Sequence, residues 1–145
     1  MKITLSKSQV MELNGIFQYL SNELTDGKPV KRNPYFSYAI ARNKDLLKPV
    51  VAAIEETQKI TLVDYLKEAE DINKTLEGKT DEEKKFIVLS SRPILEEKYK
   101  EPLSASTAFL AGTEELDLYT INLSTVGDIS AAVMEVLFNL CDPDK

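Results

Sequence analysis

The sequence contains no histidine and no tryptophan, and it contains a single cysteine, Cys141. Without histidine, Ser-His and Cys-His catalytic pairs are excluded, as are nearly all zinc and non-haem iron sites. One cysteine also excludes an internal disulfide framework. We interpret Cys141 as a small apolar side chain near the end of the last helix, with a reactive thiol as the alternative.

Glycine and long apolar runs are also scarce. The five glycines are scattered, and none belongs to the loops that cradle the phosphates of nucleotides. No apolar run approaches the ~18 residues that a membrane-spanning helix needs, and the first ten residues lack the apolar core of a signal peptide. We therefore expect a cytosolic product with no cofactor, no metal site and no membrane contact.

Positive charge is in the minority, because 18 lysines and arginines face 24 acidic residues and give a net charge of −6. A phosphate backbone is held by clustered basic side chains, so direct nucleic-acid binding is not expected. Lys28, Lys31 and Arg32 form one local basic cluster, which we interpret as a solvated linker, with an anion site as the alternative. Among the carboxylates, Asp64 and Glu68 would share one side of a helix. We interpret them as part of a solvated surface, with acid–base catalysis as the alternative.

The segment from Asn33 to about Leu76 dominates the chain. Its apolar residues recur at steps of three and four, which predicts one long helix or two in line. Asn33 is placed to cap this helix and Pro34 to be its first residue. We expect a kink or break at Pro49, because proline removes a backbone hydrogen bond. The β-branched residues at 59–63 leave a short strand as the alternative there.

Two short strands are expected, at 2–5 and at 116–123, and we pair them in an antiparallel ribbon. The second strand changes the parity of its apolar residues midway, so a bulge is expected near Tyr119 or Thr120. A two-stranded ribbon is marginal by itself, so it must lie on helices or extend its edge to another chain.

The other predicted helices are shorter. Ser6 or Ser8 can cap a helix that runs to about Asn22, and Thr80 with Glu83 forms the capping box of another. The prolines at 93 and 102 predict separate helices at 92–99 and 104–111, and a last helix runs from 129 to 140, between Asp128 and Pro143. Together the elements predict a mainly helical α+β fold in a single domain, residues 1–145.

An aromatic cluster lies at the start of the long segment: Tyr35, Phe36 and Tyr38. We interpret it as the first turn of the helix packing onto the amino-terminal helix. The functional alternative is a site that stacks on a base or clamps a peptide.

Three stretches carry a resemblance to known proteins: KITLSKSQVMELNGIFQYLSN, PYFSYAIARNKDLLKPVVAAIEETQK and ELDLYTINLSTVGDISAAVMEVLFNLCDP. The central one has the pattern Y-x-I-A-x-N-x-x-x-L-x-P-x-x-x-A-x-E-E, carried by Tyr38, Ile40, Ala41, Asn43, Leu47, Pro49, Ala53, Glu55 and Glu56. In these stretches the chain resembles a family of small bacteriophage and prophage proteins that has no assigned activity. The resemblance implies a phage-encoded accessory or virion-associated protein in the host cytoplasm or the virion, and it assigns no catalytic residue.

An interface with another protein is expected on two grounds. The apolar seam from Ile54 to Leu76 is about 33 Å long on a helical rise, more than the shorter helices cover. The edge of the strand at 116–123 can accept a strand from another chain. The partner would be a second copy or a phage assembly component. The predicted interaction surface consists of Ile54, Leu62, Tyr65, Ala69, Ile72, Leu76, Leu116, Leu118 and Ile121.

Three functions follow as hypotheses. The first is a non-enzymatic phage accessory, structural or assembly protein that acts through protein–protein contacts. The second is a small acidic effector that binds and inhibits a host protein. The third is an enzyme that uses carboxylates alone, with Mg²⁺.

Overall fold

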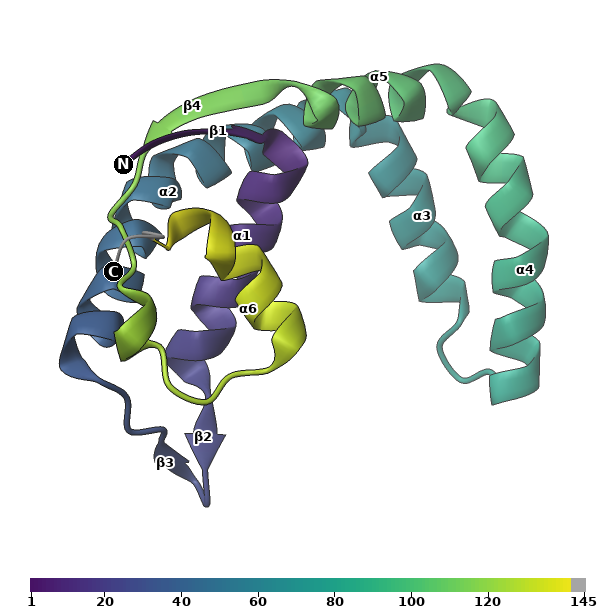
Figure 1. Cartoon of the computed structure of the whole chain (residues 1–145). Coiled ribbons are helices and arrows are strands. Elements are labelled where there is room, and N and C mark those ends of the chain that lie inside the picture. The colour runs from purple at the N-terminus through teal and green to yellow at the C-terminus, as the bar shows by residue number, and fades with distance from the viewer. Residues whose placement is uncertain (142–145) are drawn as a thin grey trace. The chain divides into compact units, whose positions relative to one another are not determined.

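The computed structural model describes residues 1–141 and confirms a mainly helical α+β fold, with six α-helices in that part of the chain (Figure 1). The described residues form two compact units, whereas the sequence analysis expects one domain. Unit 1 combines residues 1–53 with the residues from 111 onward, and unit 2 consists of residues 54–110.

The ribbon of unit 1 joins β1 (Lys2–Ser6) to β4 (Thr113–Asp117) in an antiparallel register, with Ile3 opposite Leu116. The predicted pairing is confirmed, but the second strand lies nearer the amino terminus than expected and ends at Asp117. Leu118 still donates its backbone N–H to the carbonyl of Met1 at 2.9 Å, and then the chain turns away. The change of parity near Tyr119 therefore marks the end of the strand, and no bulge is needed.

Helix α1 (Lys7–Asn22) begins with the predicted cap. Ser6 accepts a hydrogen bond from the backbone of Gln9, and the Gln9 side chain accepts one from the backbone N–H of Ser6. This reciprocal pair satisfies two backbone donors that the first turn of a helix leaves free. The apolar face of α1 then enters the core of unit 1 with Val10, Leu13, Phe17 and Leu20.

A small hairpin follows α1, formed by β2 (Leu24–Thr25) and β3 (Lys28–Pro29). Asp26 and Gly27 connect the strands with positive φ angles of 54° and 75°. Two such residues match the mirror-image turns that fit the twist of a hairpin. The solvated linker expected around Lys28 therefore begins as a short hairpin.

Helix α2 (Pro34–Thr61) starts where the sequence predicts, because the Asn33 side chain accepts a hydrogen bond from the backbone N–H of Tyr35 at 2.9 Å. The helix continues through Pro49, and the break falls at Leu62 instead. Buried Leu47 and Val51 flank the proline on both sides, so their packing offsets one missing hydrogen bond.

The β-branched stretch at 59–63 is helical rather than a strand, and it is where the helix is interrupted. The Thr61 hydroxyl donates to the carbonyl of Thr57 at 2.8 Å, a back-bond that tends to bend helices. Ile60, Thr61 and Val63 also lose rotamer freedom in a helix. The chain restarts as α3 (Val63–Thr75) after Leu62.

Unit 2 consists of the end of α2, α3, α4 (Asp81–Lys98) and α5 (Lys100–Ala111) as far as Leu110. Within it, α3 and α4 lie side by side and antiparallel (Figure 1). Thr80 caps α4 by accepting a hydrogen bond from the backbone N–H of Glu83 at 3.2 Å, as predicted.

The prediction of a separate helix at 92–99 is wrong, because α4 runs through Pro93 to Lys98. Pro93 removes one intrahelical hydrogen bond, while Leu95 on the buried side keeps the helix packed. Helix α5 begins before the predicted residue 104. Pro102 falls in its first turn, where the missing N–H has no intrahelical partner in any case.

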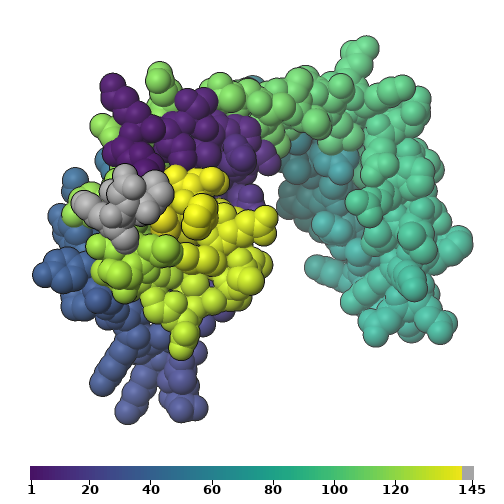
Figure 2. Space-filling model, in the orientation of Figure 1, coloured from purple at the N-terminus to yellow at the C-terminus, as the bar shows by residue number. Residues whose placement is uncertain are grey.

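After β4 the chain crosses unit 1 through a 3₁₀ turn (Leu123–Thr125) and then forms α6 (Ala131–Leu137) and a second 3₁₀ turn (Phe138–Leu140). Figure 2 shows the segment after β4 and α6 on the same face of unit 1. The backbone N–H of Ile121 donates to the carbonyl of Leu140 at 2.8 Å, which joins the two.

The last helix is shorter than predicted. The α-helix begins only at Ala131, because Ser130 rather than Asp128 provides the cap by accepting a hydrogen bond from the backbone N–H of Val133. Cys141 is buried as predicted, and burial raises the pKa of its thiol. Pro143 lies outside the described residues.

Candidate functional site

A cavity of about 520 Å³ lies in unit 1. This lies within the roughly 300–1,000 Å³ range of ligand pockets. We call it the tyrosine pocket. Its lining comes from the start of α2 and from the segment after β4: Asn33, Tyr35, Tyr38, Ala39, Tyr119, Thr120, Asn122, Ser124 and Thr125.

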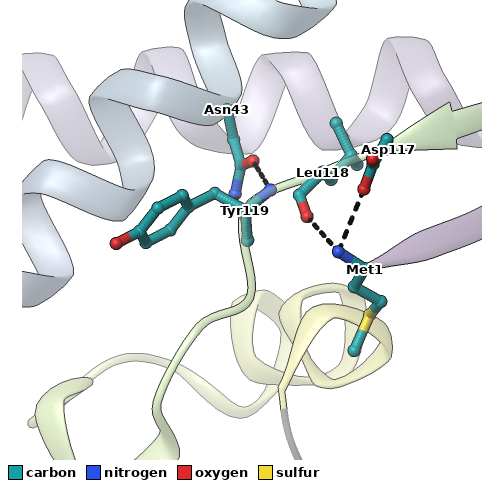
Figure 3. A network of polar contacts seen from close by, with 5 residues as sticks. All are labelled: Met1, Asn43, Asp117, Leu118 and Tyr119. Atoms are coloured by element: carbon teal, nitrogen blue, oxygen red, sulfur yellow. Dashed lines mark hydrogen bonds and ion pairs between the residues drawn. The ribbon is translucent and has the colours of Figure 1, made fainter.

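Asn43 fixes the wall of the tyrosine pocket from inside the core. Its amide nitrogen donates to the carbonyl of Tyr119 at 2.9 Å, and its amide oxygen accepts from the backbone N–H of Tyr119 at 2.6 Å (Figure 3). Asn43 is fully buried, so these two bonds satisfy groups that have little access to water. The amino-terminal ammonium of Met1 donates to the carbonyl of Leu118 at 2.9 Å and to the carboxylate of Asp117 at 3.1 Å. These two bonds hold the end of β4, just before Tyr119.

The tyrosine rings are held in a defined arrangement. The rings of Tyr38 and Tyr119 meet edge to face, with centroids 5.5 Å apart and planes at 82°. Tyr35 is largely exposed at the rim, while Phe36 between them points into the core. Phe36 is therefore a core residue, as the predicted packing role requires, whereas both tyrosines present most of their surface to solvent.

The basic cluster borders a second cavity, of about 410 Å³, which shares Asn33, Ser124 and Thr125 with the tyrosine pocket. Arg32 is committed to a carboxylate, because its guanidinium forms an ion pair with Glu23 and only 9% of its side chain is exposed. Asp128 adds a negative charge to the same wall. Arg32 is therefore neither a solvated linker residue nor free to bind an anion.

The helical hairpin of unit 2 has an inner seam. Tyr65, Ala69 and Ile72 of α3 line a narrow cavity of about 150 Å³ together with Val88 and Leu95 of α4. The half-buried predicted seam of α3 thus faces α4, which covers part of it.

The outer side of α4 also carries large apolar side chains, beside the acidic residues Glu82 and Glu97. At 3.6 residues per turn, Phe86 lies on the opposite side of the helix from Leu95. Phe86 is 71% exposed, and Leu89 and Ile94 are exposed to a similar degree. We call Phe86, Leu89 and Ile94 the outer face of α4. Ile60, Val63 and Leu66 add further exposed apolar side chains near the break between α2 and α3.

A polar cluster ties α3 to the end of α4. Glu68 accepts hydrogen bonds from the Tyr99 hydroxyl and from the Lys98 ammonium, the latter at 3.0 Å to each carboxylate oxygen. The bond from Tyr99 and then the bond from Lys98 lower the pKa of Glu68, and the bonds to Glu68 raise the pKa values of Lys98 and Tyr99. Tyr99 also meets Tyr65 edge to face at 5.8 Å. These contacts give Glu68 a structural role, and Asp64 takes no part in them.

The predicted interaction surface divides into two groups. Ile54, Leu118 and Ile121 are buried in the described structure, so the prediction that they present a surface is wrong for these three. They were selected for apolar spacing, which does not separate a core position from an interface position. The others are half-buried: Leu62, Tyr65, Ala69, Ile72, Leu76 and Leu116.

The outer face of α4 was missed in the sequence. The sequence does contain a signal for this face. Phe86 and Leu89 are three positions apart, on a helix whose other side carries Val88 and Leu95. The mistaken break at Pro93 hid this pattern by dividing the helix.

Within residues 1–141, no group of three or more acidic or cysteine side chains is arranged to hold a metal ion. No helix in the same residues is both long and apolar enough to cross a bilayer. No protein-family model, curated protein or solved structure matches this chain. Function is therefore inferred from the chemistry of the tyrosine pocket and of the outer face of α4.

Proposed function

We propose that this chain is a non-enzymatic bacteriophage accessory, structural or assembly protein that acts through protein–protein contacts. The observation that carries the proposal is the distribution of apolar side chains around α4. Leu95 is buried on one side, while Phe86, Leu89 and Ile94 are exposed on the other. The resemblance of the sequence to small phage proteins supports the phage context.

A helix that is apolar on both sides is normally covered on both sides. Helix α3 covers one side of α4. Clusters of large exposed apolar residues are uncommon on soluble monomers and typically mark interaction sites. The outer face of α4 is therefore the contact surface of this proposal.

The partner that fits this face is a second copy of the chain, with the two α4 helices antiparallel. A two-fold axis is the commonest symmetry of chains that associate with themselves, and an axis that crosses the middle of α4 sets the two helices antiparallel. In this arrangement Phe86, Leu89 and Ile94 of one copy lie against the same residues of the other.

A disulfide test reports on this arrangement. Ser90 lies near the middle of the outer face of α4, so Ser90→Cys places thiols of two copies close to the two-fold axis. The expected result is a covalent dimer on mild oxidation, while Ser37→Cys, exposed on α2, forms no covalent dimer. Equal yields from the two variants, or no dimer from Ser90→Cys, would overturn the antiparallel contact.

A small acidic effector that binds and inhibits a host protein is the second candidate, favoured by the net charge of −6. Purified virions distinguish the two functions. Detection of the chain in the particle supports the structural or assembly role, whereas its absence, combined with stable co-purification with one host protein, supports the effector.

A further inference from the structure

The tyrosine pocket in unit 1 is separate from the outer face of α4, and it has the features of a peptide site. We infer that it binds a proline-containing segment of a partner protein in the polyproline II conformation. This inference does not depend on the proposed self-association.

The shape of the pocket favours a proline ring. Tyr38 and Tyr119 present two ring systems at 82° to one another, and Tyr35 stands beside them at the rim. Proline-rich segments dock into grooves lined by aromatic side chains, where each flat pyrrolidine ring packs against an aromatic face. The segment is also extended before it binds, so little conformational entropy is lost.

Two side-chain amides of the pocket have donors to offer a ligand, because their oxygens make the internal hydrogen bonds. The Asn33 side-chain oxygen accepts from the backbone of Tyr35, and the Asn122 side-chain oxygen accepts from the backbone and hydroxyl of Ser124. The carbonyl of Tyr119 accepts from Asn43. Among residues 1–141 no hydrogen bond is described for the amide nitrogens of Asn33 and Asn122, so both can donate to a ligand.

A proline segment is the complementary ligand. Proline has no backbone N–H, and a polyproline II helix makes no internal hydrogen bonds, so its carbonyls are all free to accept. These carbonyls can accept from the side-chain amides and hydroxyls that line the pocket.

Charge argues against an anionic ligand such as a nucleotide. No aspartate, glutamate, lysine or arginine is among the nine residues that line the pocket. In the adjoining cavity, which Lys31 and Arg32 line, Arg32 is paired with Glu23. A neutral ligand therefore fits better than a phosphate-bearing one.

The pocket is also rigid on its inner side. Two hydrogen bonds with buried Asn43, one donated and one accepted by its side chain, hold the backbone of Tyr119. Tyr38 and Ala39 belong to the second turn of α2. A site that is ordered before binding gains affinity because less freedom is lost on association.

The test uses the full chain labelled with ¹⁵N and decaproline as the probe, followed by NMR. The expected result is a saturable shift of the backbone amides of Tyr35, Tyr38 and Tyr119 and of the side-chain amides of Asn33 and Asn122. A glycine-serine decapeptide and AMP are the comparison probes, and both are expected to leave these signals in place.

Matched variants assign the binding to the rings. Tyr38→Ala is expected to weaken decaproline binding about tenfold or more, as for an aromatic hot spot. Tyr19→Ala removes a tyrosine of nearly equal exposure, 56% against 54%, from α1 and is expected to leave binding within about twofold. Tyr35→Ala is a second test, because this rim residue contributes no described ring contact and its loss leaves the fold intact.

Three results would overturn the inference: no shift with decaproline at millimolar concentration, equal shifts with the glycine-serine peptide, or tighter binding of AMP at the same residues. The proposed function fails separately, through the Ser90→Cys dimer test, which involves none of the pocket residues.

Discussion

Asn43 holds Tyr119 by both of its backbone groups, through bonds of 2.9 and 2.6 Å across 76 residues of sequence. This pairing ends the ribbon after Leu118 and directs the Tyr119 ring against Tyr38. Asn43 belongs to the Y-x-I-A-x-N pattern of the central segment, and the same pattern supplies Tyr38 to the pocket and Ile40 to the core. The pattern therefore has a structural explanation in this chain.

Replacing Asn43 with alanine leaves the N–H and the carbonyl of Tyr119 without partners in a part-buried site. An unsatisfied buried group costs about 1–3 kcal/mol, so Asn43→Ala should lower the free energy of unfolding by about 2–4 kcal/mol. Urea unfolding followed by circular dichroism measures this. Asn73→Ala, at an exposed position in α3, is the control and should cause no loss. Equal midpoints for the two variants would show that the Asn43 bonds do not hold the fold.

Leu47 is completely buried in unit 1. Leu47→Ala should cost about 2–5 kcal/mol, because it removes apolar contacts and leaves a cavity. Leu24→Ala in the exposed hairpin should cost much less. An unfolding midpoint of Leu47→Ala equal to that of the wild-type protein would contradict the assignment of this α2 face to the core.

The Glu68 cluster predicts a pH dependence in unit 2. The pKa of Glu68 is lowered from 4.5 in the folded chain, so its stabilising bonds are present above that pH and are lost as the pH falls through the folded value. The pKa of Lys98 is raised from 10.5, so its contribution is present below that pH and is lost as the pH rises through the folded value.

Carboxyl ¹³C NMR of Glu68 tests this directly. Tyr99→Phe removes the hydrogen bond that is the largest cause of the shift, so the pKa of Glu68 should move back toward 4.5. Tyr65→Phe keeps the ring that meets Tyr99 and is the control. A titration of Glu68 that is unchanged by Tyr99→Phe would mean that this bond does not form in solution.

Chelation should leave the protein unchanged. The residues at 1–141 present no cluster of three candidate ligands, so neither EDTA nor added Mg²⁺ should move the melting temperature. Thermal shift with each additive is the measurement. A melting temperature that falls with EDTA or rises with Mg²⁺ would point to an oxygen-ligand site and would favour the carboxylate enzyme.

The features that the sequence predicts well depend on neighbours in the chain. The helix caps at Ser6, Asn33 and Thr80 each bond to a residue two or three positions away, so these hydrogen bonds can be predicted from the local sequence. The pairing of β1 with the region of Leu116 follows because few other strand segments are available.

The features that it predicts poorly depend on distant contacts. The end of β4 depends on Asn43, and the continuity of α4 through Pro93 depends on packing against α3. Only part of the tyrosine pocket can be predicted from the sequence, where Tyr35 and Tyr38 are three positions apart. Tyr119 joins them only because the fold brings the segment after β4 to the start of α2.

The central claim is that the outer face of α4 is a contact surface, and light scattering after size exclusion tests it most directly. The wild-type protein should elute with a mass well above the 16.3 kDa monomer. Leu89→Ser should shift it to the monomer, whereas Leu24→Ser, an equally exposed leucine in unit 1, should not. A wild-type protein that stays at 16.3 kDa across the concentration range, or a mass that does not respond to Leu89→Ser, would contradict the account.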